Sequence, residues 1–374
     1  MSTAQKILMG DERAALALRA LYRGYGYTQY KMNKFEEYDL YVQNKDFLVS
    51  DNVITFTDTS GKLLALKPDV TLSIVKNSRG EGDTKRVYYQ ENVYRVSGRT
   101  HTFREIMQVG LECIGNTDAY CLFEVLTLAA KSLVTIGESA VLDVSHLGIV
   151  SAVLDSLGVP ASTRQQLLRC VGEKNLHELN AIAACAGADE KKIALLGKLV
   201  TLHGKPSTVL PTLLRALEGV APAKMLTDFA SLLTALERSP IGELVRIDFS
   251  VVSDMGYYNG IVFKGFVAGA AEGLLSGGEY GGLMRKMGRS ESAIGFAVYL
   301  DALERLGEDV PAYDVDTVVV YDENADPAAL GAALEALIAS GKSVTARPSV
   351  PEKLRYRTLL KFDAREGKLY EANA

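Results

Sequence analysis

Three polar clusters in the sequence carry residue types that can bind a small molecule. The first is the stretch KPDVT at 67–71, where the Asp69 carboxylate and the Thr71 hydroxyl follow the end of an expected β-hairpin. Loops at the ends of strands commonly carry binding residues. Asp69 has a second explanation, because an aspartate just before TLSIVKNS is also a suitable N-cap for a helix. Both interpretations of Asp69 are open at this point.

The second cluster lies on two expected neighbouring strands, KRVYYQENVYRV and EIMQVGLECIG, and contains Arg95, Gln108, Gly110 and Glu112. Residues two apart in a strand share a face, so positions 108, 110 and 112 line one surface and Gly110 leaves room on it. A groove edged by an amide and a carboxylate suits a small cationic or zwitterionic ligand. The alternative is a solvated sheet face.

The third cluster consists of MGYYNG at 255–260 and SGGEYGGL at 276–283. Tyr257, Tyr258 and Tyr280 offer ring faces and hydroxyls, and the paired glycines let the backbone approach a ligand closely. Core aromatic residues beside turn glycines would explain the same pattern. None of the three clusters is specific by itself.

Composition limits what such a site can be. The chain has 374 residues and a net charge of −5, so its overall field does not attract nucleic acid or an anionic membrane. It contains no P-loop and no H-E-x-x-H sequence, and we predict no metal and no cofactor. No C-x-x-C pair and no ligand spacing is seen among Cys113, Cys121, Cys170, Cys185, His101, His146, His177 and His203. We expect the cysteines to be buried free thiols and His146 and His177 to be structural.

The N-terminus has no signal-peptide pattern, and no run reaches the roughly 18 apolar residues of a membrane span. We therefore expect a cytoplasmic protein with no membrane contact.

The elements that must position these clusters follow from the periodicity. Apolar spacing predicts a helix from Asp11 to about Gly24, and VITFTDTSGKLLAL predicts two strands joined by a tight turn at Ser60-Gly61. Helical periodicity then dominates from about Gly148 to Gly242, which predicts an all-α block between β-rich parts.

After the helical block, LVRIDFSVV and YYNGIVFKGFV predict strands, Ser276-Gly277-Gly278 predicts a glycine-rich turn, and a helix is expected from about Gly295 to Leu306. The last sixty residues predict a strand at DTVVVY, a helix at DPAALGAALEALIASG and a strand at KSVTARP, a small α/β arrangement.

Taken in order, these segments resemble a class II aminoacyl-tRNA synthetase, and specifically the histidyl-tRNA synthetase family. NVYRVSGRTHTFREIMQVGLECIG resembles motif 2, SAIGFAVYLDALERL resembles motif 3, and FEEYDLYV resembles the entry to the first hairpin. MGYYNGIVF and GGEYGGL resemble the two histidine-specific peptides. The resemblance covers most of residues 1–308.

This resemblance implies an α+β fold, with a class II synthetase-like antiparallel sheet core over 1–310 that is interrupted by the helical insertion at about 148–242. Residues 311–374 would form a short C-terminal α/β domain similar to a truncated anticodon-binding domain, too short for productive tRNA reading.

Three positions depart from the family where its ATP chemistry needs charge. Ser97 stands in place of the motif 2 glutamate, Ser253 in place of the arginine of the first histidine-specific peptide, and Ala302 in place of the motif 3 arginine. Losing one such preorganised group typically costs about 2.7–4 kcal/mol of transition-state stabilisation. The resemblance therefore implies that adenylation activity is lost and that the chain has no catalytic residues.

The amino-acid pocket of the family is kept. By position, Asp69 and Thr71 match the groups at the α-amino end of histidine, Gln108 the amide near its carboxylate, and Glu112 with Tyr257 and Tyr258 the groups around the imidazole. Arg95, which matches the arginine that grips the α-phosphate, and Tyr280 complete the expected histidine-binding set. Glu112 would serve as an acceptor for an imidazole N–H.

A synthetase-like core with this combination is similar to the regulatory subunits of ATP phosphoribosyltransferase, the first enzyme of histidine biosynthesis. That resemblance implies a non-catalytic subunit that forms a homodimer, joins a short-form catalytic subunit in a hetero-octamer, activates it, and mediates allosteric inhibition by L-histidine. Two alternatives stay open: a divergent histidyl-tRNA synthetase or other adenylate-forming ligase, and a free-standing paralogue that binds protein or RNA through its helical insertion.

Overall fold

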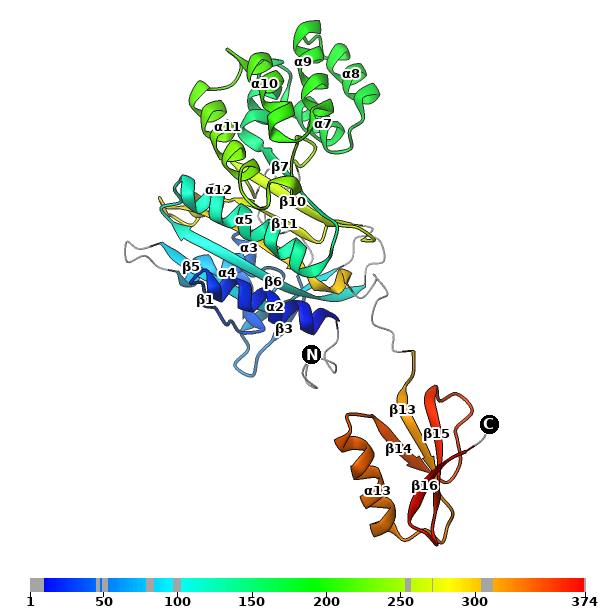
Figure 1. The fold of residues 1–374 in the computed structure, drawn as a ribbon. Helices are drawn as coiled ribbons and strands as arrows, with labels where there is room; N and C mark the ends of the chain where they lie inside the picture. The colour runs from blue at the N-terminus through cyan, green and yellow to red at the C-terminus, as the bar shows by residue number, and fades with distance from the viewer. Residues whose placement is uncertain are drawn as a thin grey trace. The chain divides into compact units, whose positions relative to one another are not determined.

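The computed structural model describes residues 10–44, 48, 53–78, 84–96, 102–252, 257–270, 272–303 and 312–372. These residues form two compact units, one within 11–303 and one containing 312–372 (Figure 1). The candidate site lies in the larger unit.

A nine-stranded sheet organises the larger unit. Its strand order is β1-β5-β6-β12-β11-β10-β7-β9-β8. All neighbours are antiparallel except β1 with β5 and β7 with β9. In that order the strands are Thr28–Gln29, Lys85–Val96, Phe103–Gly115, Ser292–Tyr299, Leu275–Glu279, Ile261–Val267, Ala140–His146, Val245–Asp248 and His203–Gly204.

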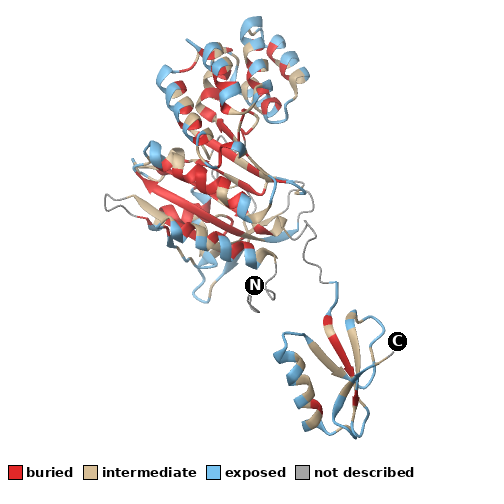
Figure 2. Ribbon diagram, viewed as in Figure 1, coloured by how far each residue is buried: buried red, intermediate tan, exposed pale blue. Residues whose placement is uncertain are grey.

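One face of this sheet packs against two helices, α2 (Gly10–Gly24) and α5 (Ala119–Ile136). The Tyr22 hydroxyl of α2 hydrogen-bonds Ser132 of α5 at 2.9 Å, which ties the two helices together. Val109, Leu111 and Cys113 of β6 point into this core, so the residues that alternate with them point to the opposite face. Buried residues follow the central strands and the inner sides of these helices (Figure 2).

Helix α5 is the one helix among the described residues that is long and apolar enough to cross a membrane by length and composition. It also contains Glu124, whose carboxylate lies 3.0 Å from Arg86, and most of its residues are buried against the sheet. These contacts are those of a core helix.

The opposite face of β5 and β6 is covered by smaller elements. A three-stranded sheet of β2 (Phe35–Glu37), β4 (Leu63–Leu66) and β3 (Thr55–Thr57) carries the short helix α3 (Tyr38–Val42) and leads into α4 (Thr71–Asn77). The hairpin expected around Ser60-Gly61 is thus confirmed, as are the first helix and the two long strands.

The helical block contains α6 (Leu147–Ser156), α7 (Ala161–Gly172), α8 (Leu176–Cys185), α9 (Glu190–Thr201), α10 (Pro206–Leu217) and α11 (Ala223–Glu237). Helix α11 packs against α5 and α6, which joins the block to the sheet. The expectation of an all-α block was wrong at β8, because His203–Gly204 pairs with β9 and extends the sheet. A short 3-10 turn, η2 (Gly242–Leu244), precedes β9.

Two expectations after the block were wrong. Ser276-Gly277-Gly278 is not a turn but the middle of strand β11. Its glycines are needed for space, since a Cβ at Gly277 would lie 2.4 Å from the Gly295 carbonyl oxygen. The helix expected from Gly295 is instead strand β12, followed by the short 3-10 turn η3 (Leu300–Ala302), and residues 304–306 lie outside the described chain. Helix α12 (Gly281–Lys286) separates β11 from β12.

The smaller unit is a four-stranded sheet, β14-β13-β15-β16, with one helix. Strand β13 (Val315–Val320), helix α13 (Pro327–Ala339) and strand β14 (Val344–Arg347) match the sequence expectation. Strands β15 (Tyr356–Asp363) and β16 (Lys368–Glu371) were missed. Asp326 caps α13 by accepting the N–H groups of Ala328 and Ala329.

Candidate functional site

The structure brings the eight residues expected to bind histidine to the wall of one cavity. They come from the start of α4, from β5 and β6, and from the chain just before β10 and just after β11. The residues are Asp69, Thr71, Arg95, Gln108, Glu112, Tyr257, Tyr258 and Tyr280. These five segments converge only through the register of the sheet, because the first and last of the eight residues are more than two hundred positions apart.

Glu112 is at the centre of this wall. Its side chain is almost fully buried, and each carboxyl oxygen meets one hydroxyl at 2.6 Å, Thr71 Oγ1 on one side and the Tyr280 hydroxyl on the other. Strand β12 passes directly over it, since Gly295 pairs with Glu112 in the sheet and a Cβ there would fall 1.7 Å from a carboxyl oxygen. The position of Glu112 is therefore fixed by both neighbours and by backbone.

Burial raises the pKa of the Glu112 carboxyl to about 8, although the hydrogen bonds from Thr71 and Tyr280 act in the opposite direction. The group therefore carries a proton at neutral pH. From the sequence we expected an acceptor-only carboxylate, and both oxygens do accept hydrogen bonds here. Burial nevertheless favours the protonated form in the free protein, because a charged acid in this position has lost its water. Protonated Glu112 can donate one hydrogen bond as well as accept others.

Asp69 lines the cavity and is half-buried. Its Oδ1 accepts the Leu72 N–H at 2.9 Å, so it caps α4 and lines the cavity at once. Burial raises the pKa of the Asp69 carboxyl above its ordinary value. The hydrogen bond from the Leu72 N–H and the nearby Arg95 charge act in the opposite direction but do not cancel the effect of burial. Arg95 is held in place by a hydrogen bond from its Nε to the Pro68 carbonyl oxygen at 2.9 Å. Both explanations considered for Asp69 are thus compatible.

Tyrosine rings close the rest of the cavity. The rings of Tyr257 and Tyr258 meet edge to face with centroids 4.7 Å apart, and Tyr257 lies 5.8 Å from Tyr280. Gln108 and Glu112 are buried, so this part of β6 is no solvated face. The room expected over Gly110 is taken by the ring of Tyr89, whose hydroxyl would lie 2.5 Å from a Cβ there.

Sequence reasoning missed three polar side chains of this wall, Tyr89, Ser276 and Tyr299. Ser276 and Tyr299 share a hydrogen bond of 2.9 Å. Tyr89 of β5 pairs with Gly110 of β6, so its place in the wall could have been predicted from the two-strand pattern of the sequence. Ser276 belongs to the third cluster of the sequence analysis, but no role was given to its hydroxyl because its segment was expected to be a turn.

The space left between these side chains is about 50 Å³. That is room for roughly four water molecules, so a whole amino acid enters only when side chains of the wall shift.

The structure describes one of the three positions at which the resemblance implies a lost ATP contact. Ser97 and Ser253 lie outside the described residues, as does His101. Ala302 ends η3 and its methyl group packs against the hydrophobic core. At this position the chain offers no positive charge to a phosphate.

Three cysteines and His146 have structural surroundings, whereas His177 on α8, which was expected to be structural, is exposed. Cys113, Cys121 and Cys170 are buried free thiols, as expected, whereas Cys185 is exposed. His146 caps α6 by accepting the Gly148 N–H at its Nδ1 atom, 3.1 Å away.

Comparisons with known proteins give the family of the chain. Residues 10–303 match the family model for histidyl-tRNA synthetase. A curated relative from Anaeromyxobacter sp. (strain Fw109-5), named ATP phosphoribosyltransferase regulatory subunit, is 30% identical over 314 residues, which are 80% of this chain and 91% of the relative. The chain belongs to the histidyl-tRNA synthetase family. Its similarity to the ATP phosphoribosyltransferase regulatory subunits, expected from the sequence, is confirmed.

Two solved structures show the same fold. A crystal structure from Bacillus halodurans, described as an ATP phosphoribosyltransferase regulatory subunit/histidyl-tRNA synthetase, has a TM-score of 0.75 at 23% identity and covers 94% of this chain and 93% of its own. The ATP phosphoribosyl transferase complex from Thermotoga maritima has a TM-score of 0.61 at 18% identity and covers 76% and 96%. The family member described here is therefore an α+β protein with a class II synthetase-like fold.

Proposed function

We propose that this chain is the non-catalytic regulatory subunit of an ATP phosphoribosyltransferase, and that it binds L-histidine in the cavity around Glu112. Curated relatives that span most of the chain bear that name, and the Thermotoga maritima relative was solved as an ATP phosphoribosyl transferase complex. In the proposal the chain forms a homodimer, joins a short-form catalytic subunit in the cytoplasm, activates it, and mediates feedback inhibition.

The observation that carries the proposal is the buried, hydroxyl-bound Glu112 in the same unit as Ala302. The first is an intact polar site for a small nitrogen-containing ligand, and the second removes a charge that ATP chemistry needs. A protein with this pair of features can retain amino-acid binding without adenylation. A productive synthetase would need the amino-acid site together with a positive charge at position 302.

The protonated state of Glu112 suits an imidazole. Near neutral pH the free imidazole of histidine is mostly uncharged, with an ordinary pKa of about 6.5, so it can take the proton that Glu112 holds. The resulting imidazolium and carboxylate form a charge-assisted pair. Asp69 lines the same cavity and offers a carboxylate oxygen to the ammonium group.

Inhibition then follows from linkage. Suppose that histidine binds this subunit more tightly in the low-activity arrangement of the complex than in the active one. Histidine then shifts the equilibrium between the two arrangements by the ratio of these affinities, typically about 5–150-fold or 1–3 kcal/mol. The same coupling requires that the catalytic subunit change the histidine affinity by an equal factor.

The test begins with calorimetric titration of the purified chain with L-histidine, with and without Mg–ATP. We expect binding that Mg–ATP does not alter. A matched pair of variants locates the ligand: Glu112→Ala should weaken binding, and Glu105→Ala, which removes an exposed carboxylate on the same strand, should leave binding unchanged. Binding strengthened by Mg–ATP would support the divergent synthetase instead.

The second stage adds the short-form catalytic subunit. Glu112→Ala should weaken histidine inhibition while the activation of the catalytic subunit is unchanged, and light scattering should give the stoichiometry of the complex. Equal inhibition by histidine in mutant and wild-type complexes would remove Glu112 from the site. A chain that never joins the catalytic subunit would refute the regulatory role.

A further inference from the structure

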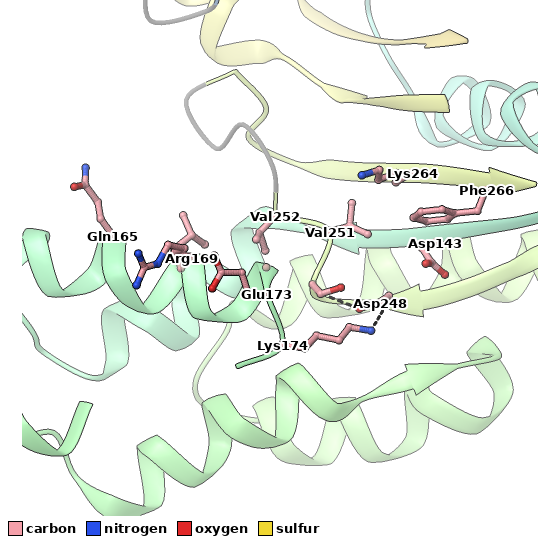
Figure 3. A pocket seen from close by; sticks show the side chains of 13 residues that line it. Asp143, Gln165, Arg169, Glu173, Lys174, Asp248, Val251, Val252, Lys264 and Phe266 are labelled. Carbon is pink, nitrogen blue, oxygen red and sulfur yellow. Dashed lines mark hydrogen bonds and ion pairs between the residues drawn. The ribbon is translucent and has the colours of Figure 1, made fainter. Parts of the chain in front are cut away.

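A second, larger cavity lies between the helical block and the sheet. Its volume is about 670 Å³, within the range of small-molecule sites. One side is formed by the end of α7 and the chain that follows it, and the other by β7, β10 and the end of β9 (Figure 3). None of the eight residues of the first cavity lines it.

The sheet side of this second cavity presents opposite charges next to each other. Asp143 of β7 and Lys264 of β10 are directly paired in the sheet, so their side chains leave the same face. Both line the cavity. Among the residues that the structure describes, Lys264 has no ion pair, and its Nζ lies 5.6 Å from the centre of the Phe266 ring. The ammonium of Lys264 is thus available to an anionic group.

The Asp143 carboxylate has fewer hydrogen-bond donors than it can accept from. The Oδ1 atom of Asp143 is closed off from solvent and has no hydrogen-bond partner in the described chain. His203 Nε2 is 3.7 Å from it, beyond hydrogen-bonding distance. A buried carboxylate oxygen without a donor is costly. Burial and the nearby charge of Asp248 both raise the pKa of the Asp143 carboxyl.

Asp248 is already paired. Its Oδ2 lies 2.7 Å from Lys174 Nζ, and its Oδ1 accepts the Ser250 N–H at 2.8 Å. Figure 3 shows Lys174 reaching Asp248 from the helical side of the cavity. The ligand atoms of Asp143, His203 and Asp248 lie within 4.8 Å of one another, a spacing that a metal ion can bridge. The Lys174 ammonium, however, already supplies a positive charge there, which favours a ligand with one further cationic group over a divalent metal.

The remaining wall is mixed. Leu168, Val251, Val252 and Phe266 give it an apolar part, whereas Gln165, Arg169, Glu173 and Ser250 are polar. Arg169 is already paired, because its Nη2 lies 2.7 Å from Glu178. A matching ligand has one ammonium, one carboxylate and a compact body.

We propose that the second cavity binds a free α-amino acid, with its ammonium group at Asp143 and its carboxylate at Lys264. This site is separate from the proposed histidine site and does not depend on it. The two cavities are neighbours in the sheet, because Lys264 pairs with Ser276 of β11, which lines the first cavity. The second cavity adds an amino-acid sensor on the side of the helical block.

The probe is a panel of the twenty common L-amino acids, each titrated into the full-length chain by calorimetry. We expect at least one to bind and its affinity to fall about tenfold or more in Asp143→Asn and in Lys264→Met, because each change removes a charged hydrogen-bonding partner. The corresponding amino-acid amide, which lacks the carboxylate, should bind wild type and Lys264→Met equally. Circular dichroism verifies that each variant is folded.

Thr71→Val, a change confined to the first cavity, is the matched control. It should reduce histidine binding there and leave the second site unchanged, so the failure of one proposal can be told from the failure of the other. If every amino acid that binds is lost in Thr71→Val and retained in Asp143→Asn, the second site is refuted. Zn²⁺ or Mn²⁺ binding that requires Asp143, with no amino acid bound there, would also overturn it and indicate a metal site.

Discussion

Replacing Glu112 by glutamine should stabilise the free protein increasingly as the pH rises. Glutamine has nearly the same shape as the protonated acid and can keep a hydrogen bond to both Thr71 and Tyr280, but it never ionises. The wild-type carboxyl has a folded-state pKa of about 8 and an ordinary value of 4.5. Between these values the folded state holds a proton that the unfolded state has released, so folding stability falls as pH rises.

The size of the expected stability change follows from this difference in protonation between the folded and unfolded states. From pH 6 to pH 8 the wild-type protein should lose about 2 kcal/mol through this group, and the variant should lose none of it. Urea unfolding of the larger unit at pH 6, 7 and 8, read as the difference between variant and wild type, isolates this contribution. Other titrating groups cancel in the difference.

Glu291→Gln is the matched control. Arg289 holds the pKa of the Glu291 carboxyl below its usual range, so neither state changes protonation between pH 6 and 8. Its stability difference from wild type should be independent of pH. A difference for Glu112→Gln that is equally constant would show that Glu112 is ionised in the folded protein, and the reasoning about its burial would be refuted.

Three further predictions concern the same unit. If histidine takes its imidazolium proton from Glu112, its affinity measured by calorimetry should be highest between about pH 6.5 and 8 and should fall on both sides, and in Glu112→Gln the fall above pH 8 should disappear. Gly295→Ala should prevent stable folding, with a loss of at least about 4 kcal/mol by urea unfolding, because the added Cβ meets a Glu112 oxygen and the backbone of Leu111; unchanged stability would contradict the packing described above. His146→Asn should keep the N-cap of α6 while removing a group whose pKa burial lowers from 6.5 to about 4. Since the unfolded state alone binds that proton, wild type should lose about 2 kcal/mol relative to this variant between pH 7 and pH 5, as urea unfolding at the two pH values would show.

The sequence predicted the larger part of the fold because the decisive patterns are local. Apolar spacing and turn residues predict the first helix, the hairpin at Ser60-Gly61 and the β5–β6 pair. The errors fell where the local pattern and the tertiary context disagree. Ser276-Gly277-Gly278 has the composition of a turn, but backbone from β12 needs the space that its missing side chains leave.

The candidate site was predicted through resemblance and not through residue chemistry. Spacing in β6 put Gln108 and Glu112 on one face, but it gave no reason to bring Tyr280 to them, because that contact depends on the register of β11 and β12. Protonation of Glu112 was equally out of reach, since the burial that causes it is a tertiary property. The second cavity was missed because Asp143 and Lys264 lie more than a hundred residues apart.

If histidine regulates the complex as proposed, the packing of Gly295 over Glu112 limits how histidine-insensitive variants would arise. The pocket floor is shared with the sheet, so many substitutions that close the pocket would also prevent the subunit from folding. A genetic screen that demands growth in the presence of a toxic histidine analogue would therefore recover few changes at Gly295. It should instead collect changes at side-chain ends such as the hydroxyl of Thr71, whose removal alters the ligand site and leaves the strand pairing intact.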